Sequence, residues 1–65
     1  MQILLNGEPR VTPQHLGLSA LIVELKLGGR LAVELNGVIV PRSTWAQVFL
    51  TDGDRLEIVH AIGGG

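Results

Sequence analysis

Two Asn-Gly pairs, Asn6-Gly7 and Asn36-Gly37, restrict the fold of this chain more than any other feature. Both central residues of a type I′ turn need a positive φ angle, and Asn followed by Gly adopts that conformation at low cost. Each pair separates two short segments with strand-like composition. The sequence therefore predicts two β-hairpins, with strands at residues 2–6 and 8–12 and at residues 31–35 and 38–40. Pro9 cannot donate a ladder hydrogen bond, so the second strand is expected at a sheet edge.

Between the hairpins the apolar residues follow a helical period. The stripe consists of Leu18, Leu21, Ile22 and Leu25. It predicts a helix over residues 19–27, with Ser19 as the N-cap and with Gly28 or Gly29 closing the helix in a left-handed conformation. This helix is short enough to depend on packing against a sheet.

The last third of the chain predicts one helical turn at residues 43–46, a tight turn at residues 51–54 and a final strand at residues 55–60. Leu56 and Ile58 of that strand are expected to face inward. Placing the last strand parallel to the first buries the apolar sides of both under the helix. The predicted fold is α+β, a ubiquitin-like β-grasp with a mixed sheet of about five strands and one main helix packed across it.

Composition limits both the core and the partners. A chain of 65 residues forms one domain, and without cysteine it depends on a core that is mainly Leu, Ile and Val. Trp45 and Phe49 are expected to cap one end of this core. Five scattered Lys and Arg residues and a net charge of −1 argue against a nucleic-acid partner. No apolar run approaches a membrane span and no signal peptide is recognisable, so we expect a cytoplasmic protein without a membrane partner.

Catalytic and metal-binding patterns are weak throughout. His15 and His60 lack the spacing of a metal site or a catalytic triad. Two carboxylates in Asp52-Gly53-Asp54 are too few for calcium, so a plain turn is expected there. Gly28-Gly29 follows a helix, whereas a phosphate loop precedes one. We expect no catalytic residue, bound cofactor or metal, and no enzymatic activity of the chain by itself.

The chain finishes with Gly63, Gly64 and Gly65, directly after an apolar strand end. We expect residues 1–62 to form the β-grasp domain and residues 63–65 to form a flexible glycine tail. Such a tail is narrow because it has no Cβ, so it could enter a channel that excludes side chains. The carboxylate of Gly65 is then the only candidate reactive group.

Three stretches of the chain form a recognisable series: "MQILLNGE" at the start, the "NG" and "VIVPRSTWAQ" segments in the middle, and "TDGDRLEIVHAIGGG" at the end. In these stretches the whole chain resembles the ThiS-type sulfur carriers of thiamine biosynthesis, a branch of the ubiquitin-like β-grasp family. The family's essential element is a final Gly-Gly, which corresponds to Gly64 and Gly65, and Gly63 lengthens the tail.

The resemblance implies a carrier that acts as a co-substrate. An adenylating, E1-like enzyme would use ATP and magnesium to convert the Gly65 carboxylate into an acyl-adenylate, and a cysteine-derived persulfide would supply sulfur to give a thiocarboxylate. Thiazole synthase would then take this sulfur for the thiazole ring. The carrier itself is expected to be a monomer.

Three other readings remain open from the sequence. Related carriers serve molybdopterin synthesis or tRNA thiolation, some β-grasp proteins are conjugated to lysines as protein modifiers, and a glycine tail can also lack a function. The "VIVPRSTWAQ" segment favours the thiamine route.

Partner docking is predicted on the sheet face turned away from the helix. Alternation along the last strand places one set of side chains on that face. The predicted docking residues are Arg55, Glu57, Val59 and Ala61.

Overall fold

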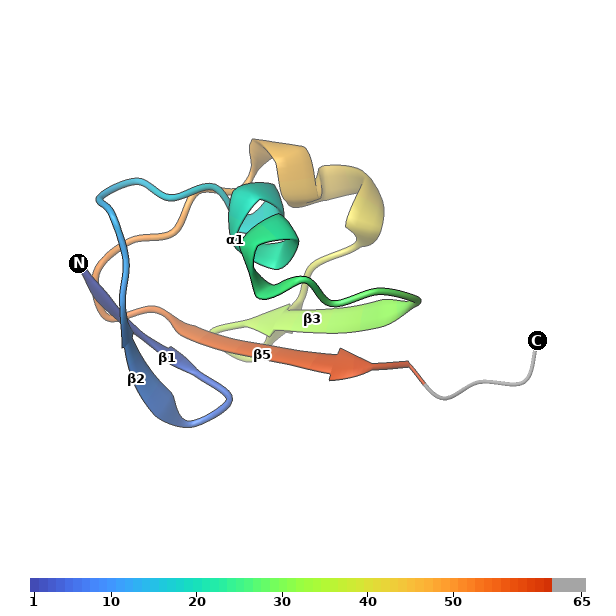
Figure 1. Cartoon of the computed structure of the whole chain (residues 1–65), viewed down its shortest axis with the longest axis horizontal. Helices are drawn as coiled ribbons and strands as arrows, with labels where there is room; N and C mark the ends of the chain where they lie inside the picture. The colour runs from blue at the N-terminus through green and yellow to red at the C-terminus, as the bar shows by residue number, and fades with distance from the viewer. Residues whose placement is uncertain (62–65) are drawn as a thin grey trace.

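The computed structural model describes residues 1–61, and within them a five-stranded sheet carries both helices on one face (Figure 1). The elements in chain order are β1 (Gln2–Leu5), β2 (Glu8–Val11), α1 (Leu18–Leu25), β3 (Leu31–Leu35), β4 (Val38–Ile39), the 3-10 helix η1 (Arg42–Gln47) and β5 (Arg55–His60). The predicted α+β fold with one main helix across a sheet is confirmed. Among residues 1–61 the helices offer no candidate for a membrane-spanning segment.

The sheet is mixed, with strand order β2-β1-β5-β3-β4. Strands β1 and β5 are parallel, with Leu4 opposite Arg55 and Leu5 opposite Leu56, and all other pairs are antiparallel. The last strand therefore occupies the middle of the sheet, between the two hairpins. Strand β2, which contains Pro9, lies at an edge as predicted.

Both predicted hairpin turns are present. Asn6 and Gly7 have φ angles of 51° and 83°, and Asn36 and Gly37 have 51° and 84°. All four angles fall in the left-handed region that a type I′ turn requires. The local sequence signal therefore produces the same turn twice.

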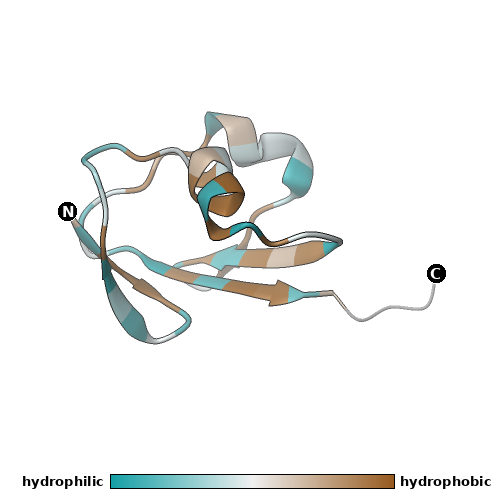
Figure 2. Cartoon of the chain, viewed as in Figure 1, coloured by the Kyte–Doolittle hydropathy of each residue, from teal (hydrophilic) through white to brown (hydrophobic). Residues whose placement is uncertain are grey.

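The core lies between α1, η1 and the inner face of the sheet, and Figure 2 shows apolar residues on both α1 and the strands beneath it. Its buried members are Ile3, Leu18, Leu21, Ile22, Val33, Trp45, Leu50, Leu56 and Ile58. The inward orientation of Leu56 and Ile58 is confirmed. Trp45 is buried and donates its indole N–H to Val40 O at 2.9 Å. The expectation for Phe49 was wrong, because its side chain is 60% exposed and lies beside Gly17.

The predicted limits of the helix were also wrong at both ends. The helix begins at Leu18 with Gly17 in the N-cap position, and Ser19 is already inside it. Two tertiary hydrogen bonds fix this start: Leu18 N–H donates to Val48 O at 2.9 Å, and Leu50 N–H donates to Leu16 O at 2.9 Å. At the other end Lys26, not a glycine, takes the left-handed conformation, with φ at 56°.

Candidate functional site

Strand β5 is the last described strand before the predicted tail, and the side chain of Asn6 fixes one edge of this strand. The β1–β5 ladder pairs residues only as far as Leu56. Beyond this point Asn6 Oδ1 accepts a hydrogen bond from Ile58 N–H at 2.9 Å, and Asn6 Nδ2 donates to Ile58 O at 3.1 Å. The amide side chain thus takes the place of a backbone peptide and extends the contact between β1 and β5.

Asn36 holds the start of β5 from the opposite side. Its backbone N–H donates to Arg55 O at 2.7 Å, and its Oδ1 accepts from Arg55 N–H at 2.9 Å. Its Nδ2 donates to Asp54 Oδ1 at 3.1 Å. Both hairpin turns therefore anchor the strand that precedes the tail.

The far end of β5 remains attached to the chain before β3. Ala61 N–H donates to Arg30 O at 2.9 Å, and His60 Nε2 lies 3.1 Å from Gly28 O. The predicted reactive carboxylate of Gly65, and the tail positions Gly63 and Gly64, lie outside the described residues. Their roles stay predictions.

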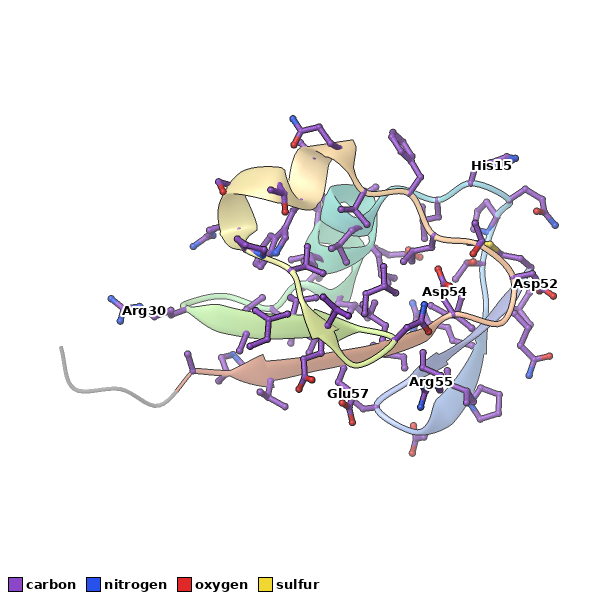
Figure 3. All side chains as sticks on the ribbon, turned by 180° about the vertical axis from the view of Figure 1, so that it is seen from behind. His15, Arg30, Asp52, Asp54, Arg55 and Glu57 are labelled. Atoms are coloured by element: carbon purple, nitrogen blue, oxygen red, sulfur yellow. The ribbon has the colours of Figure 1, made fainter. Side chains whose placement is uncertain are left out.

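The predicted docking residues on β5 are exposed, and Figure 3 shows Arg55 and Glu57 projecting from the sheet on the side away from the helix. Ala61, just past the strand, is exposed as well. Cross-strand pairing adds residues that sequence reasoning missed: Ala32 lies opposite Val59, Glu34 opposite Glu57, and Ile39 opposite Glu34. These side chains line a shallow concavity of about 590 Å³ together with Asn6 and Val33. The alternation of side chains along β3 could have identified the residues of this strand that face outward. Only the register between β3 and β5 shows which of these residues lie opposite which residues of β5.

The segment from Thr51 to Asp54 is a turn closed by its carboxylates. Asp54 accepts hydrogen bonds from Thr51 N–H at 2.8 Å and from the Thr51 hydroxyl at 3.1 Å, and Asp52 accepts from Gln2 N–H at 2.8 Å. Partial burial raises the pKa of Asp54, but the bonds from Thr51 and Asn36 outweigh this effect and hold the pKa below its ordinary value. Asp54 thus closes the predicted turn, and Asp52 ties the turn to the start of β1.

Neither histidine lies in a group that could hold a metal. Within residues 1–61 no three acidic or histidine side chains come together at a candidate metal position. His15 is exposed in the loop before α1 with φ at 57°, and His60 faces the Gly28 loop.

Comparison with known proteins agrees with this geometry. Thiazole synthase from Paramagnetospirillum magneticum is 48% identical over the whole chain, which spans only 20% of that protein's length. Sulfur carrier protein ThiS from Escherichia coli is 35% identical, with both chains covered completely. The crystal structure of the thiamine biosynthesis protein ThiS from Geobacter metallireducens superposes with a TM-score of 0.89 and 30% identity over all of both chains. The ThiS family model matches residues 3–65, and the chain therefore belongs to the ThiS family.

Proposed function

We propose that this protein is a sulfur carrier of thiamine biosynthesis that carries sulfur as a thiocarboxylate on Gly65. The observation that carries the proposal is the family match, which extends through Gly65. The full-length similarity to a protein named sulfur carrier protein ThiS supports the same function.

The chemistry requires activation before sulfur transfer, because a free carboxylate is a poor acyl donor. The Gly65 carboxylate attacks the α-phosphorus of ATP, releases pyrophosphate and becomes a mixed anhydride with AMP. The terminal sulfur of a persulfide then displaces AMP from the carbonyl carbon. A thiol then attacks the donor's sulfur atom in the resulting acyl disulfide and forms a new disulfide with it. The bond between the two original sulfur atoms breaks, and the sulfur on the carbonyl carbon remains as the thiocarboxylate.

The partners supply the catalytic groups in this scheme. An adenylating enzyme binds ATP and magnesium, a persulfide donor supplies sulfur, and thiazole synthase receives it. The similarity to a protein named thiazole synthase supports the last assignment. The chain itself provides a narrow glycine segment after a strand that both hairpins anchor.

Intact-mass spectrometry tests the proposal directly. After incubation with the adenylating enzyme, ATP, magnesium and a persulfide donor, the mass should rise by the difference between one sulfur and one oxygen atom. Deleting Gly65 or adding a residue after it should abolish this change without altering the melting curve, because chain ends contribute little stability. A misplaced carboxylate loses its alignment with the α-phosphorus.

The same assay separates the alternatives. Gly64→Ala should slow adenylation without unfolding the domain, because a Cβ would crowd a channel shaped for bare backbone. Normal thiolation of the extended protein would contradict the proposed role of Gly65. Adducts on target lysines would instead indicate a protein modifier.

A further inference from the structure

We propose that the outer face of the sheet is a docking surface for thiazole synthase, and that a guanidinium group of that enzyme binds between Glu34 and Glu57. This inference rests on the proposed function and names the surface through which one of its partners is recognised. The surface comprises Ala32, Glu34, Ile39, Glu57 and Val59, and we refer to it as the outer face.

The outer face places two like charges on facing residues. Glu34 and Glu57 lie directly opposite each other on β3 and β5, where like charges destabilise a sheet. Among residues 1–61 the one ion pair joins Arg10 to Glu24 at 3.8 Å, so no cation of this region pairs with either glutamate. A cation from outside would relieve the repulsion.

The apolar side chains beside the two glutamates favour a planar cation as their partner. Ile39 is 74% exposed and Val59 is 57% exposed, and both line the same concavity as the glutamates. A guanidinium offers several N–H donors in a fixed plane and can bridge two carboxylates, whereas an ammonium is a compact point charge. Apolar contacts around such a pair would exclude water and strengthen it.

The choice of thiazole synthase follows from the relative that contains this domain. In the Paramagnetospirillum protein of that name, a segment 48% identical to the whole chain is part of the same polypeptide. Covalent linkage raises the effective concentration of one domain near the other and favours direct contact. Strand β5 supplies Glu57 and Val59 to the outer face and also leads toward Gly65, so docking here would bring the tail toward the same enzyme.

Calorimetric titration of the full chain with purified thiazole synthase tests the docking surface. We expect Glu34→Gln and Glu57→Gln each to weaken binding about tenfold, and the double variant to weaken it further. Glu8→Gln is the matched control, because it removes the same charge from an exposed position on β2 and should leave the affinity unchanged. Added salt should lower the affinity of the parent protein more than that of the double variant, because salt screens the two glutamate charges that only the parent carries.

Thermal unfolding separates docking from a structural role. Because each Glu→Gln change relieves the facing repulsion, the melting temperature should hold or rise while affinity falls. Loss of stability in parallel with affinity, parent-like binding by the double variant, or a loss of binding confined to the adenylating enzyme would overturn the inference. The thiolation assay contains no thiazole synthase. It therefore tests the proposed function of Gly65 independently of the docking surface.

Discussion

The two Asn-Gly hairpins have nearly identical turns but attach to β5 in different ways. Asn6 directs both atoms of its amide to the backbone of Ile58, in a partly buried position. Asn36 directs its amide to Arg55 N–H and to the Asp54 side chain, in an exposed position. The difference shows that the local Asn-Gly sequence specifies the turn. The residues of β5 and the preceding turn that the asparagine contacts determine how much it contributes to the stability of the sheet.

The largest expected difference between the hairpins comes from replacing each asparagine by glycine. Glycine keeps the positive φ angle, so the substitution removes the amide contacts and leaves the turn geometry accessible. Asn6→Gly should cost about 2–3 kcal/mol, because two backbone groups of Ile58 lose partners in a partly buried site, and Asn36→Gly should cost about 1 kcal/mol, because water can replace its contacts. Urea unfolding measures the free energy of unfolding of both variants. Equal losses of stability would contradict the proposed difference between Asn6 and Asn36.

A smaller difference should appear with pH. Asp54 has a lowered pKa, so its contribution to stability is present above the pKa of the unfolded chain and is lost as pH falls through the folded value. The cost of Asn36→Gly should therefore shrink in acid, because protonated Asp54 no longer offers Asn36 Nδ2 a charged acceptor. The Asn6 amide contacts only backbone atoms, so the cost of Asn6→Gly should be the same at both pH values. Unfolding at neutral pH and at a pH well below the folded pKa of Asp54 checks this prediction.

The smallest expected difference is between Gly7→Ala and Gly37→Ala. The two glycines have φ angles of 83° and 84°, and an added Cβ would meet no atom within 4 Å at either position. Each substitution should cost about 1–2 kcal/mol from left-handed strain alone. The two melting temperatures should therefore fall by the same amount. Unequal falls would mean that the turns themselves differ, and the contrast between Asn6 and Asn36 would lose its basis.

Sequence reasoning succeeded where a feature depends on neighbouring residues. The Asn-Gly turns follow from the positive φ angles that these two residues adopt. Strand β2 lies at an edge because Pro9 has no N–H to donate, and Leu56 and Ile58 point inward because side chains alternate along a strand. The parallel pairing of the first and last strands was also predicted, because it was the arrangement that buried both apolar sides under one helix.

Two wrong predictions, and one feature that the sequence did not predict, involve distant contacts. Ser19 has the chemistry of an N-cap, but Gly17 occupies that position, and the helix begins at Leu18, whose N–H donates to Val48 O. Phe49 is apolar, yet the strand-like pairing of its segment with Gly17 leaves the ring exposed. The facing of Glu34 and Glu57 depends on the register between two strands, which neither strand encodes alone.

The central position of β5 also has a consequence for how the domain is made. The strand in the middle of the sheet is the last element of the domain to leave the ribosome, because β1 to η1 all precede it. Until it emerges, the two hairpins have no common neighbour and cannot form a joint sheet. Closing the long loop from β1 to β5 is expected to be slow, because contacts distant in sequence form late. A nascent chain interrupted before residue 55 would expose its apolar surfaces to proteases. Degradation would then remove chains that stop short of the strand before Gly65, without any enzyme that inspects the terminus.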